Sequence, residues 1–541
     1  MSNFVRGTMI LTAAIFISKI LGFIYVVPFK ALVGTQGYVL YNYAYQAYIV
    51  LLSFTTMGIP LAVSKFVSKY NELGDYETGR RLFRSGLLLM LGTGLVSFIL
   101  LFIYAPSIAL VVIDPHDTSG NSLEDITHVI RMVSMALLIV PAMGIIRGYF
   151  QGHHSMGPTA VSQVIEQIVR IIFILICSYL VLRVWNGALS TAVGFATFGA
   201  FVGGVGGMAT LYYYWRKRRS YLERPFQNRL GYQQVTYWNM YKELISYAIP
   251  FVFVGLTIPL YSFIDTFTIN QALTSIGYKQ GGAEEINAVM ALVQKVILVP
   301  VALATAMSLT LVPIITKAYT SKDQKLLHQY VTQSFQVIIY ITLPMVVYMS
   351  VMSYPIYTLL YSLSEYLLGG KILRWYAPTA ILFALFTVTA AILQGINLQR
   401  YVLLSLSIGI VFKAFFNTFF IIHFEELGPI IATNAGFLFS ISLNLVFIRR
   451  FLHYRFKHRL KQHFLILLQV MLATLGLIIL KWISEILFTI GRLESFIVVG
   501  VTGSLFVLLY IWLGLRSNLL FIILGDRVRV LDRFKKKKME A

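Results

Sequence analysis

Long runs of apolar residues without a single charge are the feature that most constrains how this chain folds. Residues 86–112 and 187–215 contain no Asp, Glu, Lys or Arg. A helix needs about 20 mostly apolar residues to cross the hydrocarbon core of a bilayer, and both runs are longer than that. Lipid offers no partners to backbone polar groups, so runs of this kind are typical of transmembrane helices. The sequence therefore predicts an all-α, polytopic membrane protein.

The composition extends this prediction to the whole chain. Its 541 residues are 58% hydrophobic and 12% charged, whereas soluble proteins carry about 25% charged residues. We expect fourteen transmembrane helices, at about residues 7–33, 38–64, 85–112, 130–151, 157–183, 187–215, 243–275, 285–316, 328–363, 375–399, 401–423, 427–448, 463–484 and 493–515. The first span follows Arg6 without a cleavage motif, so we expect it to act as its own targeting signal.

The basic residues indicate the orientation. Most of the 44 Lys and Arg residues fall in alternate loops and in the C-terminal tail. Since cytoplasmic loops carry the excess of Lys and Arg, both termini are predicted to be cytoplasmic. The net charge of +22 is then a topology signal, and no nucleic-acid partner is expected. The basic end of the chain is expected to bind anionic membrane lipids.

Two halves of the chain resemble each other. IPLAVSKFVSKY (59–70) is similar to VPIITKAYTSKD (312–323), and NGALSTAVG (186–194) is similar to LGPIIATNAG (427–436). Parallel repeats of this kind form two lobes with the substrate between them. The predicted parts are an N-lobe of six helices (1–220), a cytoplasmic linker (221–242), a C-lobe of six helices (243–450), two extra helices (451–515) and a basic cytoplasmic tail (516–541).

Six ionisable residues fall well inside the predicted spans: Lys19, Glu166, Arg170, Asp265, Lys295 and Lys413. Insertion of a charge at mid-span costs roughly 2.5–3.5 kcal/mol, so these side chains are expected to face water or one another. Glu166 and Arg170, one helical turn apart, are predicted to pair. A purely structural ion pair remains an alternative for these two residues, and snorkelling to an interface remains one for the lysines.

The sign of these charges points to an anionic substrate. Lys19, Arg170, Lys295 and Lys413 are predicted to bind it in a central cavity, and lysine and arginine together suit phosphate. Glu166 and Asp265 are the candidates for ion pairing or for coupling to an ion.

The sequence shows no nucleotide-binding motif and no set of metal-binding residues. GGVGG (203–207) is predicted to allow close helix packing. In RGYFQG (147–152), Arg147 is expected at the cytoplasmic end of a span, with both glycines marking a turn.

Three motifs and the layout of spans resemble a known family. The motifs are SKILGFIYVVPF (18–29), GIPLAVSKFVSKYNELGD (58–75) and RGYFQGHHSMGPTAVSQVIEQIVRI (147–171). They are similar to the multidrug/oligosaccharidyl-lipid/polysaccharide (MOP) exporter superfamily, and most closely to its MurJ/YtgP-type lipid II flippases in the SpoVB-like polysaccharide biosynthesis branch, the Bacillus-type YtgP proteins above all. Lys19 stands where the family pattern has an arginine. Tyr25 and Val26 stand where many relatives have Arg-Asp.

The resemblance implies a transporter of the bacterial cell membrane, and not an enzyme. Its substrate would be the peptidoglycan precursor lipid II, an undecaprenyl pyrophosphate carrying a disaccharide-pentapeptide, moved to the outer leaflet by alternating access. Cationic cavity residues would contact the pyrophosphate, and the last two spans would hold the lipid tail. No cofactor is expected. Whether the membrane potential, protons or sodium ions drive transport stays open, as does contact with the cell-wall synthesis machinery.

Three alternatives remain at this point. The chain could move another lipid-linked polysaccharide unit or a sporulation-specific precursor. It could be a cation-coupled drug exporter of the MATE type, although a positive cavity disfavours a cationic drug. A membrane-bound glycosyltransferase is the third alternative, and the lack of paired carboxylates outside the spans argues against it.

Overall fold

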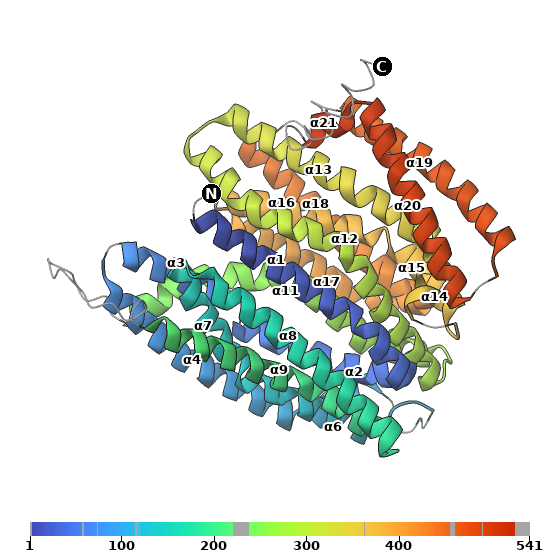
Figure 1. The fold of residues 1–541 in the computed structure, drawn as a ribbon, viewed down its shortest axis with the longest axis horizontal. Helices are drawn as coiled ribbons and strands as arrows, with labels where there is room; N and C mark the ends of the chain where they lie inside the picture. Colours follow the sequence, from blue (N-terminus) through green and yellow to red (C-terminus); the bar gives the residue numbers. More distant parts are fainter. Residues whose placement is uncertain are drawn as a thin grey trace. The chain divides into compact units, whose positions relative to one another are not determined.

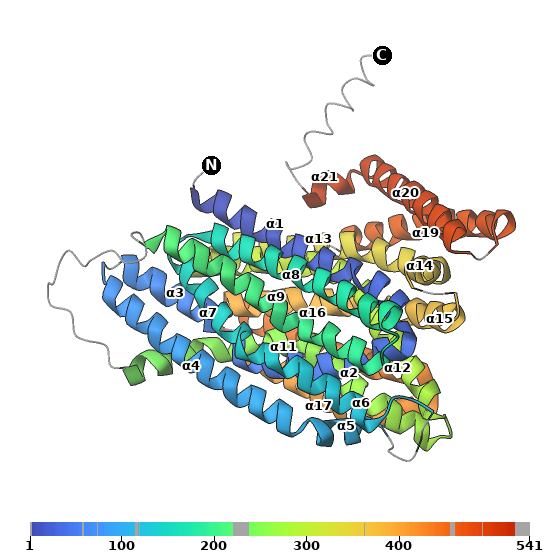
Figure 2. The same cartoon turned by 60° about the horizontal axis from the view of Figure 1, so that its bottom comes forward.

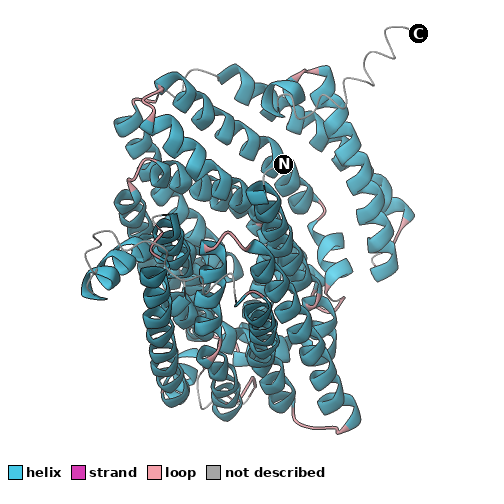
Figure 3. Ribbon diagram, turned by 60° about the vertical axis from the view of Figure 1, so that its left-hand side comes forward, coloured by secondary structure: helices cyan, strands magenta, loops and turns pink. Residues whose placement is uncertain are grey.

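The computed structural model describes residues 3–56, 59–72, 74–113, 117, 119–219, 237–361, 363–454, 460–489 and 491–524. Within these ranges the chain is helical, with short turns and no strand (Figure 3). The predicted all-α class is confirmed. The described residues form two compact units, Met1–Ala291 and Leu292–Ala541. Most of the predicted linker and of the basic tail lies outside the described residues.

The first unit consists of α1 (Asn3–Ile24), α2 (Val26–Thr56), α3 (Ile59–Glu72), α4 (Tyr76–Ile103), α5 (Ala105–Val112), α6 (Leu123–Ser134), η1 (Met135–Leu138), α7 (Val140–Gly152), α8 (Met156–Tyr179), η2 (Leu180–Val184), α9 (Leu189–Lys217), α11 (Tyr237–Ser275) and the start of α12 (Gln280–Thr320). The helices α4, α7, α8 and α9 lie side by side in it (Figures 1 and 2).

The second unit contains the rest of α12, followed by α13 (Gln324–Val351), α14 (Ser353–Leu360), α15 (Tyr366–Tyr376), α16 (Thr379–Gly395), α17 (Gln399–Phe424), η3 (Glu425–Leu427), α18 (Gly428–Leu452), α19 (Leu460–Leu487), α20 (Arg492–Arg516) and α21 (Leu519–Leu524). The hairpin of α19 and α20 docks on this unit through polar contacts. The Tyr348 hydroxyl of α13 donates to the Val499 carbonyl of α20 (2.7 Å), and the buried Gln469 amide of α19 donates to the Tyr340 hydroxyl of α13 (3.2 Å).

Eleven stretches among the described residues are long and apolar enough to cross a membrane. Four of them run over more than one α-helix, and two of these four, Ala13–Thr56 (44 residues) and Gln399–Leu452 (54 residues), are long enough to cross a membrane twice. A multi-pass membrane protein is therefore confirmed.

Several predicted spans are interrupted, and the local sequence explains where. The predicted span 7–33 comprises α1 and the first turns of α2, and α2 itself kinks at Gly34. Gly34 has φ 69°, a conformation that favours glycine because it has no Cβ. The predicted span 85–112 breaks at Tyr104, just before Pro106 at the start of α5. Proline lacks a backbone N–H, so it fits the first turn of a helix and interrupts a helix interior.

Glycines set the close helix contacts in the first unit. A Cβ on Gly203 of α9 would lie 2.8 Å from the Glu166 carbonyl oxygen of α8, so the predicted packing role of GGVGG is confirmed. The prediction that Gly148 and Gly152 mark a turn is wrong. Both belong to α7, and they face α3, where a Cβ on Gly148 would collide with the Pro60 carbonyl. Their small size lets α7 lie directly on α3.

Candidate functional site

Two arginines in the first unit have different surroundings. Arg147 of α7 forms a salt bridge with Glu166 of α8, with 2.8 Å between Nη2 and Oε2. The Arg147 Nε also donates to the Ser162 hydroxyl, one turn earlier on α8 (2.9 Å). Both side chains are largely buried, with 13% and 20% exposed. This pairing neutralises one arginine inside the helix bundle and joins α7 to α8.

The predicted pair of Glu166 with Arg170 is absent from the described contacts, and this prediction is corrected. The i, i+4 spacing does place both side chains on one face of α8, but Arg147 reaches Glu166 from the neighbouring helix. Arg147, which was expected at the cytoplasmic end of a span, lies in the second half of α7, and its largely buried side chain binds Glu166. The partner of Glu166 is thus a residue on another helix, and the spacing of residues along α8 cannot reveal it.

Arg170 lies against aromatic rings of α2 in place of a carboxylate. Its Nη2 donates to the Tyr41 hydroxyl (3.3 Å), and its guanidinium lies 5.3 Å from the centroid of the Tyr45 ring. The Tyr41 hydroxyl also bonds to the Tyr25 hydroxyl (3.1 Å). We call Arg170, Tyr25, Tyr41 and Tyr45 the arginine–tyrosine cluster. It combines one unneutralised cation with phenolic donors.

The guanidinium of this cluster retains unused binding capacity. The Arg170 Nε is buried and has no hydrogen-bond partner among the described residues, and no acidic side chain described in the structure pairs with Arg170. A buried cation without a carboxylate is costly, so the site favours an incoming anion. A guanidinium fork matches the geometry of phosphate oxygens.

Lys19 lies on α1, which packs against α8. A Cβ on Gly22, nearly one turn after Lys19, would lie 3.2 Å from the Gln167 Nε2. The contact therefore falls on the part of α8 that carries Glu166 and Arg170. Lys19 is exposed, and the structure gives it no ion pair or hydrogen bond with another described residue.

Asp265 is buried on α11, beside a chain of buried amides that joins α2, α11 and α12. The Asn42 amide donates to the Thr266 hydroxyl (3.3 Å), and the Asn287 amide donates to the Thr266 carbonyl (3.0 Å). The Asn270 amide donates to the Tyr43 hydroxyl (2.5 Å). Asp265 thus lies in a polar region of the first unit.

The other two predicted cations belong to the second unit. Lys295 on α12 is partly buried. Lys413 on α17 is fully buried, and its ammonium donates to the Thr433 hydroxyl of α18. Of the six predicted residues, the structure therefore brings Glu166 and Arg170 onto one helix, with α1 and Lys19 beside that helix.

Hydrogen bonds join the loop before α6 to the start of α12 in the first unit. The Glu284 carboxylate of α12 accepts hydrogen bonds from the Asn121 backbone N–H (3.0 Å) and side-chain amide (2.9 Å). The Asp117 carboxylate accepts from the Gln280 backbone N–H (2.8 Å). Hydrogen bonds from Ser119, together with this one, hold the pKa of Asp117 below its usual range. The loop before α6 is thereby fastened to the start of α12.

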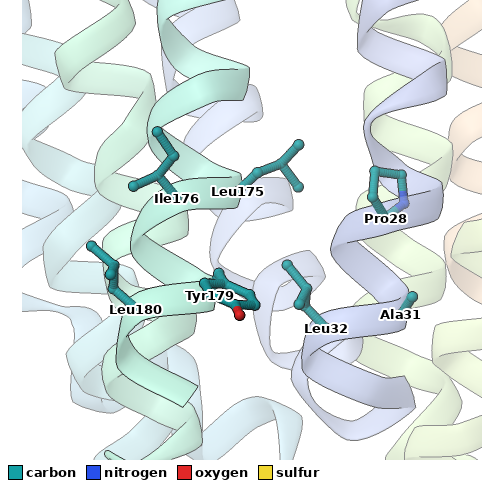
Figure 4. Close-up of a pocket in the computed structure, with 7 residues that line it drawn as sticks. All are labelled: Pro28, Ala31, Leu32, Leu175, Ile176, Tyr179 and Leu180. Carbon is teal, nitrogen blue, oxygen red and sulfur yellow. The ribbon is translucent and has the colours of Figure 1, made fainter. Parts of the chain in front are cut away.

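An apolar pocket of about 540 Å³ opens between the first turns of α2 and the end of α8. Leu175 and Tyr179 of α8 and Leu32 of α2 extend into it (Figure 4). With no charged residue in its lining, this pocket suits a hydrocarbon chain and not a head group.

The sequence prediction missed three features of this region. The tyrosines of α2 recur at positions 38, 41, 45 and 48, a helical spacing that places them on one face. That spacing was the available signal for the aromatic surface under Arg170. Glu284 falls at the edge of a predicted span and was not counted as a buried acid. The partner of Arg147 lies on another helix, so no sequence signal indicated it.

Comparison with known proteins gives consistent matches. The profile described as "Polysaccharide biosynthesis protein" matches residues 4–319, and that described as "MatE" matches residues 250–419. The Bacillus subtilis (strain 168) protein "Lipid II flippase MurJ" is 44% identical over 533 residues, which cover 97% of this chain and 98% of that relative. "Stage V sporulation protein B" of the same organism is 25% identical and covers 76% of each chain.

A solved structure shows the same fold. "Lipid II flippase MurJ, inward closed conformation" matches with a TM-score of 0.66 at 14% sequence identity, over 95% of this chain and 99% of that one. The shared fold extends over nearly the full length of both chains, so it includes the two C-terminal helices α19 and α20.

Proposed function

Since this chain belongs to the MurJ family of polysaccharide biosynthesis proteins, we propose that it is a lipid II flippase. It moves undecaprenyl-pyrophosphate-linked saccharide-peptide from the inner to the outer leaflet of the bacterial cell membrane. It is a transporter and not an enzyme. The single observation that carries this proposal is the 44% identity to the Bacillus subtilis flippase along almost the entire chain.

We assign the pyrophosphate to the cationic residues inside the spans. Arg170 presents a guanidinium with an unused donor, and Lys19 lies on the adjacent helix α1. Lys295 contributes from α12. Lys413, which is fully buried, acts as a supporting charge within the second unit rather than as a direct contact. A phosphate group between Lys19 and Arg170 would gain charge-assisted hydrogen bonds in a site of low dielectric.

We further propose fourteen transmembrane helices, with both termini in the cytoplasm. The eleven apolar stretches become fourteen spans when the two long stretches are each divided at their helix break and α11 is added. The first twelve spans form two lobes that alternate in access, and α19 and α20 hold the prenyl tail. Anionic lipids at the basic tail and the cell-wall synthesis machinery are the proposed partners.

The membrane potential supplies a driving force for this movement. Moving one charge across the membrane is worth about 2.3 kcal/mol per 100 mV, and an interior-negative potential drives an anion outward. No cofactor is required. We assign Glu166 to holding α7 against α8, since it is bound by Arg147. Asp265 is then the candidate for coupling to a proton or a sodium ion.

Two other functions compete with this one. A flippase for a different lipid-linked glycan or for a sporulation precursor would share the cavity chemistry, and the similarity to "Stage V sporulation protein B" favours keeping it as an alternative. A drug exporter is less supported, because the MatE profile matches only residues 250–419 and the predicted cavity carries excess positive charge.

Genetic rescue tests the proposal. A bacterium depleted of its own MurJ-type flippase should regain growth when it expresses this chain. A strain that lacks its sporulation relative and a strain that lacks its dye exporters serve as parallel hosts. Rescue of sporulation alone, or efflux of a cationic dye without rescue of growth, would assign the chain to the corresponding alternative.

A further inference from the structure

A second apolar groove lies on the first unit, on the side of α9 away from the proposed pyrophosphate residues. It has a volume of about 690 Å³ and is formed by α4, α7 with η1, and α9. Phe83 and Leu87 of α4, Ile146 of α7, and Tyr212 and Trp215 of α9 line it. Phe83 and Trp215 stack, with ring centroids 5.2 Å apart, so one end of the groove is a rigid aromatic wall.

Basic residues continue the lining beyond this aromatic end. On α4, Arg80 and Arg84 have the helical spacing that places them on the face of Phe83 and Leu87. On α9, Arg216 follows Tyr212 by one turn, and its guanidinium lies 5.1 Å from the centroid of the Tyr212 ring. The helical spacing and the Arg216–Tyr212 contact therefore place three arginines next to the aromatic end of the groove.

These arginines are not neutralised by the protein. No ion pair joins Arg80, Arg84 or Arg216 to an acidic residue in the part of the chain that the structure describes. The Arg80 Nε is buried and has no hydrogen-bond partner there. A buried guanidinium donor without a partner is unfavourable, and an anion beside it removes that cost.

His153, at the end of α7, lies close enough to Arg80 for their charges to interact. His153 is buried, and burial lowers the pKa of its imidazole, with the nearby charges of His154 and Arg80 adding to the effect. The lowered pKa favours the neutral imidazole over the cation. The local charge at this end of the groove remains positive.

We propose that this groove binds an anionic phospholipid, with an acyl chain along the apolar wall and the phosphate at Arg80, Arg84 and Arg216. Basic pockets between transmembrane helices select anionic head groups, and arginine forms paired hydrogen bonds with phosphate oxygens. An apolar groove alone would accept any lipid, so the arginines provide the selectivity. The positive-inside orientation places the site in the cytoplasmic leaflet. The site does not depend on which substrate the protein transports.

The test compares lipids on the purified full-length protein in detergent. Thermal unfolding is measured against dioleoyl-phosphatidylglycerol and dioleoyl-phosphatidylcholine, and retained lipid is counted by native mass spectrometry. Phosphatidylglycerol should stabilise and remain bound at concentrations about tenfold lower than phosphatidylcholine, because its head group carries a net negative charge, whereas the choline cation cancels the phosphate charge of phosphatidylcholine. The Arg84→Gln/Arg216→Gln variant should lose this preference.

Two further variants make the result specific. Arg400→Gln is the matched control, since Arg400 is exposed and its guanidinium lies 5.0 Å over the Tyr401 ring. It should keep the preference. Ala209→Phe fills the groove from an exposed position on α9, so it should fold and lose retention of both lipids.

Three outcomes would overturn the proposal. They are equal affinity of the wild-type protein for the two lipids, an unchanged preference in the double arginine variant, and loss of preference in Arg400→Gln. If the double variant does not fold, Ala209→Phe decides alone, and unchanged lipid retention by it would also overturn the proposal.

Discussion

Glu166 of α8 binds Arg147 of α7 across 2.8 Å and leaves Arg170, one turn further along α8, to the tyrosines of α2. The Glu166 carboxylate thus neutralises the arginine on the neighbouring helix, although Arg170 shares its own helix. The remaining cation contacts the Tyr41 hydroxyl and the Tyr45 ring, which hold it without cancelling its charge. This division separates a structural ion pair from a candidate anion site.

Glu166→Ala should destabilise the protein by up to about 3 kcal/mol, because it leaves Arg147 largely buried without its partner. Thermal unfolding in detergent measures the change. Glu485→Ala is the control, since Glu485 is 64% exposed in its pair with Lys481, and an exposed pair contributes little. Equal melting temperatures for the Glu166 variant and the wild type would show that the bridge is not structural.

Arg170→Ala should reduce flipping about tenfold to a hundredfold while the protein still inserts, because the anion loses its charge-assisted hydrogen bonds. Tyr41→Phe removes one hydroxyl and should cause a smaller loss. Arg131→Ala is the matched control, as Arg131 also lies over an aromatic ring, at 5.1 Å from the Phe102 centroid, but outside the cluster. Wild-type flipping by Arg170→Ala would remove this residue from the proposed site.

Gly203→Ala should destabilise the contact of α8 with α9 by about 1–3 kcal/mol, since the new Cβ would lie 2.8 Å from the backbone oxygen of Glu166. Gly92→Ala, in α4, is the counterpart with no atom within 4 Å of its Cβ. It should be neutral or stabilising, because alanine is the better helix former. Thermal unfolding of the two variants distinguishes packing from helix propensity, and equal shifts would contradict the packing argument.

Asn121→Ala should loosen the loop before α6, since the Glu284 carboxylate then loses the shorter of its two hydrogen bonds from Asn121. Hydrogen exchange followed by mass spectrometry should show faster exchange in residues 119–123 and at the start of α12. Ser122→Ala is a useful comparison, because its hydroxyl caps α6 and does not contact Glu284. It should speed exchange in the first turn of α6 alone. Unchanged exchange in Asn121→Ala would mean that other contacts hold the loop.

The class of fold could be predicted from the sequence because the length of an apolar run directly indicates a transmembrane helix. The predicted span 187–215 agrees with the bounds of α9 (Leu189–Lys217) to within two residues at each end. The interruptions were harder to predict. The break at Tyr104 follows from Pro106, but the kink at Gly34 depends on a backbone conformation that many glycines never adopt.

The site could be predicted in part. Mid-span charges are costly, so Glu166 and Arg170 were identifiable from sequence as residues with a special role. Their partners were not, because Arg147, Tyr41 and Tyr45 reach them from other helices. Local spacing determines which residues share a face of one helix, whereas tertiary packing determines what that face contacts.

Appearance of lipid II in the outer leaflet tests the central claim most directly. Cells depleted of their own flippase would express this chain or its Arg170→Ala variant, with membrane insertion verified for both, and labelled lipid II accessible from outside would be measured over time. We predict that lipid II reaches the outer leaflet with the wild-type chain and does so about tenfold to a hundredfold more slowly with the variant. Lipid II that remains in the inner leaflet despite inserted wild-type protein would contradict the account.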